Sequence, residues 1–158
     1  MYRNRTLSSQ NLDFDFEETT RNISNYFGNL EKLKWELARI NAEKGLTANY
    51  DFSEEYKKQP YMPFGKDAFH LSAREFKEEE LKQYISGYYW AKSILSEEER
   101  IYIAEYFING KYETELIDLL GFDTIDSREY RQLKRSAVYK FADFLNLIVE
   151  RGEPIKNE

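Results

Sequence analysis

The sequence predicts an all-α protein with an N-terminal helical arm and a C-terminal helical bundle. The 158 residues include only seven glycines and three prolines, whereas residues that favour helices are abundant. Apolar residues also recur at intervals of three and four through much of the chain, which is the period of an amphipathic helix. We expect the arm and a connector in residues 1–72 and the bundle in residues 73–158.

The arm is predicted to be one helix over residues 16–44, which Gly45 ends with a left-handed cap. We expect Phe27 and Trp35 to widen its apolar stripe. A stripe with this spacing packs either on its own chain or against a second copy. The sequence leaves open both alternatives, an internally packed arm and a homodimer through residues 16–44. The stripe consists of Phe16, Ile23, Tyr26, Leu30, Leu33, Leu37 and Ile40.

Residues 46–72 form a connector without sustained periodicity. They contain two of the three prolines, Gly65 and six aromatic residues. A connector of this length is unusual in a compact domain unless it is packed or functional, so we expect its aromatic residues to pack. His70, the single histidine, is interpreted as a packed or exposed residue and not as a catalytic one.

The bundle is predicted to begin with a helix from Ser72 to Leu95. Ser96 and Glu99 then form a capping box, because the serine can accept from the backbone of residue 99 and the carboxylate can accept from the backbone of residue 96. The next helix therefore begins at Glu97. The residues that we expect it to turn inward are Ile101, Ile103, Ala104, Phe107 and Ile108.

A short helix at 112–120 is predicted to end at Gly121. Asp126 and Glu129 have the spacing of a second capping box, which predicts a last helix from Ser127 to about Val149. The residues expected on its inner face are Tyr130, Leu133, Ala137, Phe141, Phe144 or Leu145, and Ile148.

Positive charge is concentrated at the start of this last helix. The chain has a net charge of -6, yet residues 124–142 carry five Lys or Arg side chains and two carboxylates. The predicted order is a short helix, a turn and a second helix with a cationic start, as in a helix-turn-helix. The second helix of that motif contacts base edges in the major groove. The alternative is a solvated helix face whose cations pair with neighbouring Asp and Glu.

Helical periodicity indicates which side chains of this helix face solvent. If Tyr130, Leu133 and Ala137 point inward, the opposite side presents Ser127, Arg128, Arg131, Gln132 and Arg135. Arg can bridge guanine O6 and N7, Gln can bridge adenine N6 and N7, and Ser can hold a phosphate. These residue types suit a reader of double-stranded DNA.

The segments "LSEEERIYIAEYFINGKYETELIDLLGF" and "DSREYRQLKRSAVYKFADFL" resemble region 4 of sigma factors. More broadly, the chain resembles the ArpU-like phage transcriptional regulators of Gram-positive hosts, which are related to RinA-type activators. That resemblance is carried by "NLEKLKWELARINAEKGLTANYDFSEEYKKQPY", "YYWAKSILS" and "DSREYRQLKRSAVYKFADFLNL". The chain departs from the sigma pattern in having a longer turn, "GFDTID", before the last helix.

The resemblance implies a regulator of late packaging and lysis genes that binds double-stranded promoter DNA and acts with host RNA polymerase. Transferred by position, it makes Ser127, Arg128, Arg131, Gln132 and Arg135 the DNA contacts. It adds Lys134 and Lys140 as flanking phosphate contacts.

Several other classes of function lack their characteristic residues. The chain has no cysteine and one histidine, which removes thiol chemistry and the usual zinc ligand sets. No glycine-rich phosphate loop or Ser/His/Asp set stands out, so we expect no enzyme, no cofactor and no metal. The glutamate runs at 78–80 and 97–99 are interpreted as favourable charges at helix N-termini.

The lack of cysteines fits a reducing compartment, and no signal-like or membrane-spanning stretch stands out, so we expect a soluble cytoplasmic protein. The resemblance to phage regulators implies that the cell is a bacterial host. Two alternative functions remain. One is a sigma-like factor that docks on RNA polymerase or another host protein without reading DNA, which fits the overall acidity and the aromatic connector. The other, a DNA-packaging accessory, is disfavoured because the helix-turn-helix is C-terminal.

Overall fold

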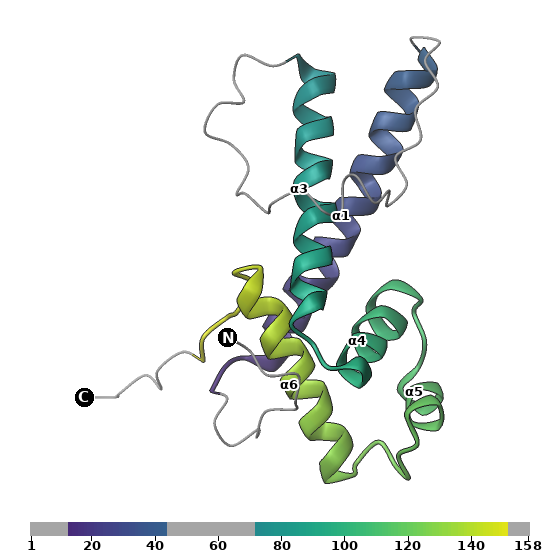
Figure 1. Cartoon of the computed structure of the whole chain (residues 1–158), viewed down its shortest axis with the longest axis vertical. Coiled ribbons are helices and arrows are strands. Elements are labelled where there is room, and N and C mark those ends of the chain that lie inside the picture. Colours follow the sequence, from purple (N-terminus) through teal and green to yellow (C-terminus); the bar gives the residue numbers. More distant parts are fainter. Residues whose placement is uncertain (1–12, 44–71, 152–158) are drawn as a thin grey trace, which may run out of the picture. The chain divides into compact units, whose positions relative to one another are not determined.

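The computed structural model describes residues 13–43 and 72–151, and all regular structure in these two ranges is helical (Figure 1). This confirms the predicted all-α class for the described part of the chain. None of its helices is long and apolar enough to cross a membrane. The expected Gly45 cap, the connector up to residue 71 and His70 lie outside the described ranges. The helices are α1 (Phe16–Glu43), α3 (Ala73–Ser93), α4 (Glu97–Ile103), the π-helix η3 (Ala104–Ile108), α5 (Glu113–Leu120) and α6 (Arg128–Phe144).

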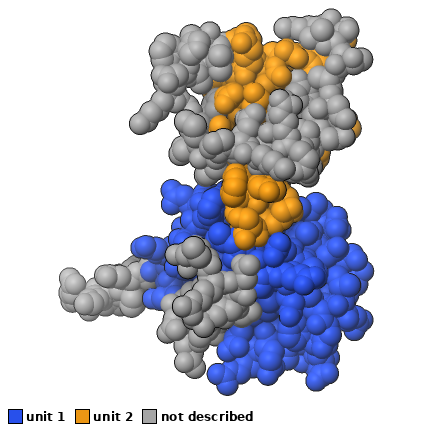
Figure 2. Space-filling view, viewed as in Figure 1, with its two compact units in different colours: residues 1–24, 94–158 blue, residues 25–93 orange. Residues whose placement is uncertain are grey.

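The chain divides into two compact units, unit 1 (residues 1–24 and 94–158) and unit 2 (residues 25–93) (Figure 2). The division differs from the expected boundary after residue 72. Helix α1 contributes to unit 1 up to Ser24 and to unit 2 from Asn25 onward. Helix α3 belongs with α1 in unit 2 because the apolar faces of these two helices pack on each other.

The core of unit 2 is formed by one apolar face from each helix. Leu30, Leu33 and Leu37 of α1 pack with Leu81 and Ile85 of α3. Full burial of such side chains contributes about 2 kcal/mol each. For Leu30, Leu33 and Leu37 the structure therefore shows the internally packed arm, because α3 of the same chain covers them.

Polar contacts also join the two helices of unit 2. The Tyr26 hydroxyl donates to the Tyr84 carbonyl, and Arg74 Nε donates to Asn41 Oδ1 at 2.7 Å. A further ion pair links Lys77 to Glu36. Because these contacts lie along the length of α1, they fix its register against α3.

Trp35 does not widen the apolar stripe, and that prediction was wrong. Its side chain is 75% exposed. Trp35 is two positions away from both Leu33 and Leu37, and two residues turn a helix by about 200°. The indole therefore lies on the face of α1 opposite to α3.

In unit 1 the capping box at the start of α4 is confirmed. Ser96 Oγ accepts from the Glu99 amide at 3.2 Å, and the Ser96 amide donates to Glu99 Oε1 at 2.8 Å. Beyond Ile103 the helix widens into η3, in which the Asn109 amide donates to the Ala104 carbonyl. This change of register leaves Ile108, which was expected to point inward, 48% exposed.

Helix α6 ends at Phe144, several residues before the predicted end near Val149. Asn146 has a φ of 59°, a left-handed conformation that asparagine tolerates better than most residues. The chain then runs along the N-terminal segment, where the Asp15 amide donates to the Val149 carbonyl at 2.8 Å. Asn22 Nδ2 also donates to the Leu147 carbonyl at 3.1 Å.

Candidate nucleic-acid interface

Helices α5 and α6 are joined by a turn that begins at Gly121. Gly121 has a φ of 83° and ends α5 as predicted. Its amide and that of Phe122 both donate to the Ile117 carbonyl. The Phe122 ring then packs against the Tyr130 ring with centroids 5.5 Å apart. The longer turn is thus fixed to α6 through an aromatic contact.

Helix α6 begins one residue later than predicted. Its N-cap is Ser127, whose Oγ accepts from the Tyr130 amide at 3.2 Å. The prediction that Asp126 caps this helix was wrong. The hydroxyl of Ser127 takes the capping position, so Arg128 is the first helical residue.

Two of the predicted DNA contacts, Arg128 and Arg131, are exposed on the first turns of α6. Ser127 and Gln132 beside them are half-buried. At about 100° per residue, Arg128, Arg131 and Gln132 lie within an arc of about 100°. No described residue forms an ion pair with either arginine. Both guanidinium groups are therefore available to an anionic ligand.

Lys134 faces α5. Its Nζ lies 2.7 Å from Glu113 Oε1, which also accepts from the Tyr130 hydroxyl at 3.1 Å. Burial and the adjacent Glu113 carboxylate together raise the pKa of Tyr130, so this hydroxyl stays protonated and continues to donate. Because Glu113 already balances the charge of Lys134, this lysine is a weaker candidate for a phosphate contact than an unpaired one.

Arg135 is half-buried beneath the N-terminal segment. Its guanidinium carbon lies 4.9 Å from the centroid of the fully buried Phe14 ring and 5.7 Å from that of Phe16. Burial lowers the pKa of Arg135, and the charge of Arg151 lowers it further. An arginine remains charged under these conditions, so stacking on the rings positions the group without neutralising it.

Lys140 cannot contact phosphate, and this prediction was wrong. Its side chain is fully buried, with Nζ 2.9 Å from Oε1 of the equally buried Glu99. The Ser136 hydroxyl donates to the other oxygen of that carboxylate. The ion pair joins the first turn of α4 to the middle of α6, so it positions the helix that carries the two exposed arginines.

The surface that adjoins the exposed arginines is acidic. Four carboxylates of α5 and the turn are exposed, namely Glu115, Asp118, Asp123 and Asp126. No Lys or Arg occurs from residue 113 to residue 127. Between residues 113 and 132 the positively charged side chains are therefore Arg128 and Arg131 alone, at the start of α6.

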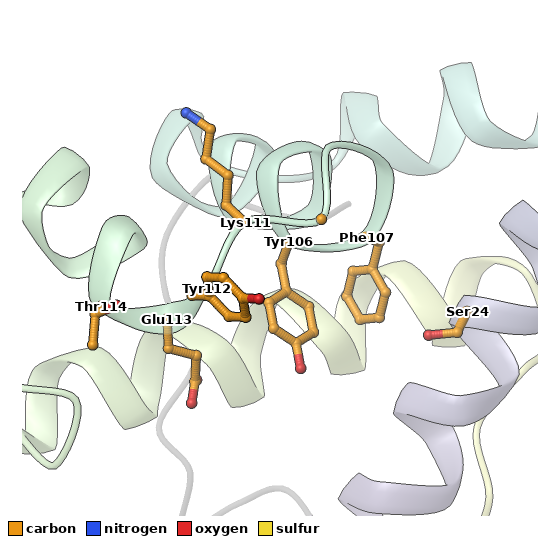
Figure 3. Close-up of a pocket in the computed structure, with 8 residues that line it drawn as sticks. Ser24, Tyr106, Phe107, Lys111, Tyr112, Glu113 and Thr114 are labelled. Carbon is orange, nitrogen blue, oxygen red and sulfur yellow. The ribbon is translucent and has the colours of Figure 1, made fainter.

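An open pocket of about 640 Å³ lies beside η3 and the start of α5 (Figure 3). Tyr106, Phe107 and Tyr112 supply aromatic walls. Its charged side chains already have partners, because Lys111 pairs with Glu105 at 3.4 Å and Glu113 holds Lys134. Within the described ranges no cluster of acidic or histidine side chains could hold a metal ion. We assign this pocket no chemistry.

The residues that sequence reasoning missed are the internal partners of the cations, Glu99, Glu113 and Phe14. Periodicity contained one usable signal, since Lys140 follows Leu133 by seven residues and Ala137 by three and so belongs to their inward face. Comparison with protein families, curated proteins and solved structures finds no significant match for this chain.

Proposed function

We propose that this protein is a sequence-specific regulator of transcription that binds double-stranded DNA with α6 as its recognition helix. The observation that carries the proposal is the exposure of Arg128 and Arg131 on one face of the first turns of α6. That helix follows a glycine-terminated helix and a turn, as in a helix-turn-helix. Each arginine can bridge a guanine, and Gln132 can bridge an adenine.

The proposed contact set is smaller than the one expected from sequence. Arg128, Arg131 and Gln132 face base edges, while Ser127 lies at the helix start, where phosphate is favoured. The span from residue 128 to residue 132 is about 6 Å along the helix, which covers about two base-pair steps. So short a reading surface implies additional contacts or a second copy on the DNA.

The resemblance to ArpU-like regulators suggests which DNA the protein binds. It points to promoter DNA of phage late genes for packaging and lysis, with host RNA polymerase as the partner in activation. The acidic surface of α5 and the turn fits such a division of roles, because phosphate would be repelled there. In this scheme the DNA meets the arginines of α6 and a protein partner meets the acidic side.

The proposal is tested by fluorescence anisotropy with labelled duplexes of random sequence at two salt concentrations. We expect Arg128→Ala with Arg131→Ala to weaken binding at least about tenfold at low salt and to reduce the salt slope by up to about two. The matched control is Arg21→Ala with Arg100→Ala, which removes two other exposed arginines of unit 1. If both double variants behave alike, α6 is not the DNA-binding element.

A sigma-like factor that binds protein without reading DNA is the second candidate. It is favoured by Leu119 and Ile125, which are 53% and 38% exposed among the acidic residues of α5 and the turn. Such a surface suits a basic protein partner with an apolar centre. Leu119→Ser with Ile125→Ser should then abolish co-sedimentation with purified RNA polymerase of a Gram-positive host, while Arg128→Ala with Arg131→Ala leaves it intact.

A further inference from the structure

The face of α1 that points away from α3 in unit 2 carries a second regular pattern. Five residues, spaced three, four, three and four apart, lie along it, and all are exposed. We call them the outer stripe: Gly28, Glu31, Trp35, Ala38 and Ala42. This is the spacing at which one helix packs against another.

Trp35 dominates the outer stripe. Its indole is 75% exposed, and burying a tryptophan removes about 150–250 Å² from water. The neighbouring stripe residues Gly28, Ala38 and Ala42 are small, so an approaching helix meets little obstruction. A Cβ built on Gly28 has no atom within 4 Å. Trp35 and the small residues beside it therefore leave apolar surface that a second helix can cover.

We infer that the outer stripe is a self-association surface, on which α1 packs antiparallel to α1 of a second copy and crosses it near Trp35. The charges on either side select this orientation. Glu31 precedes Trp35 by four residues and Arg39 follows it by four. An antiparallel crossing therefore places each Glu31 opposite Arg39 of the other copy, whereas a parallel crossing juxtaposes like charges. Two-fold symmetry forms both ion pairs at once.

The extent of the surface sets the expected strength. One helix-on-helix contact centred on two indoles falls below the roughly 1,200 Å² of a standard stable interface. We therefore expect a dimer that forms in the micromolar range and dissociates on dilution. The inference does not depend on the DNA-binding proposal, because it concerns unit 2 and needs no nucleic acid.

Sedimentation velocity of the full chain across a wide concentration range tests the association. We expect the wild type to shift from monomer to dimer and Trp35→Glu to remain monomeric at concentrations at which the wild type dimerises. Trp90→Glu is the matched control, since Trp90 is 37% exposed on α3 of the same unit, and it should dimerise like the wild type. A wild type that is monomeric throughout, or a Trp35→Glu variant that dimerises normally, overturns the inference.

The orientation can be tested by disulfide formation because the chain has no cysteine. In an antiparallel pair, Gly28 lies near Ala42 of the other copy, while equivalent positions are separated by about 21 Å, far beyond disulfide reach. An equal mixture of Gly28→Cys and Ala42→Cys should therefore form a mixed dimer on oxidation, and neither variant alone should cross-link efficiently. Efficient cross-linking of either variant alone would indicate a parallel pair and overturn the proposed geometry.

A charge exchange tests the ion pairs separately from the indole. Glu31→Arg should weaken the dimer several-fold, because two arginines then face each other at each end of the contact. Adding Arg39→Glu restores opposite charges and should restore association. If the double variant is as weak as the single one, Glu31 and Arg39 do not face each other.

Discussion

Replacing Lys140 with methionine tests the buried ion pair that joins α4 to α6. The ammonium lies 2.9 Å from Glu99 Oε1, and both side chains are fully buried. The same carboxylate accepts from the Ser96 amide and the Ser136 hydroxyl. Methionine retains most of the apolar length of lysine and removes the ammonium, so the carboxylate of Glu99 stays buried without a counter-charge.

The expected loss of stability follows from this geometry. At 2.9 Å and an effective dielectric constant near 20, the attraction between the two charges is about 6 kcal/mol. The two remaining hydrogen bonds retain part of the stabilisation, so we expect Lys140→Met to lower the free energy of unfolding by about 3–5 kcal/mol. Glu99→Gln with Lys140→Met leaves no buried charge and keeps an acceptor for the Ser96 amide. Its cost should be only about 1–2 kcal/mol.

Urea unfolding of the two single variants and the double variant measures this coupling. Far-UV circular dichroism follows the helices of both units, whereas tryptophan fluorescence follows unit 2, because Trp35 and Trp90 are the two tryptophans of the chain. We expect a coupling free energy of at least about 3 kcal/mol. If Lys140→Met costs less than about 1 kcal/mol, or if the double variant is as unstable as Lys140→Met alone, the two buried charges do not stabilise each other as expected.

Four further substitutions have expected outcomes in the same unfolding assay. Ser127→Ala should cost about 1 kcal/mol through loss of the α6 cap, whereas Asp126→Ala should change little; equal losses would contradict the assigned cap. Gly121→Ala should cost about 1 kcal/mol because it places a Cβ at a φ of 83°, and an unchanged midpoint would contradict this. Hydrogen bonding to Lys77 lowers the pKa of Glu36. The stability that the Glu36–Lys77 pair contributes is therefore fully present above the ordinary pKa of a glutamate. It is lost as the pH falls through the lowered pKa of Glu36 in the folded protein. Glu36→Gln should remove that acid-dependent part of the unfolding followed by tryptophan fluorescence, and an unchanged pH profile would refute the assignment.

Sequence predicted best those features that depend on residues within a single turn. The Ser96 and Glu99 capping box is local, because each partner reaches the backbone of the other across three residues. Gly121 is similar, since only the conformation of one residue is at issue. Helix positions followed the apolar period in the same way, because burial of one face repeats at each turn.

The contacts that the lysines and arginines of the last helix make could not be predicted in this way. A lysine or arginine carries the same charge whether it meets solvent or a partner distant in sequence. Lys140 pairs with a carboxylate 41 residues away and Lys134 with one 21 residues away. Arg135 stacks on Phe14 of the N-terminal segment. Only tertiary packing brings these partners together. Of the cationic residues of α6 that were predicted to contact DNA, Arg128 and Arg131 are the exposed ones.

The sequence-specific DNA-binding claim is tested most directly by selecting duplexes from a random-sequence library with the full-length protein. We expect the wild type to enrich a short motif. We also expect Gln132→Ala to enrich the same motif with about tenfold weaker preference at one base pair, since a bidentate contact contributes about 1–3 kcal/mol of discrimination. A wild type that enriches no motif would contradict the claim, and a Gln132→Ala variant with an unchanged motif would exclude that side chain from the reading surface.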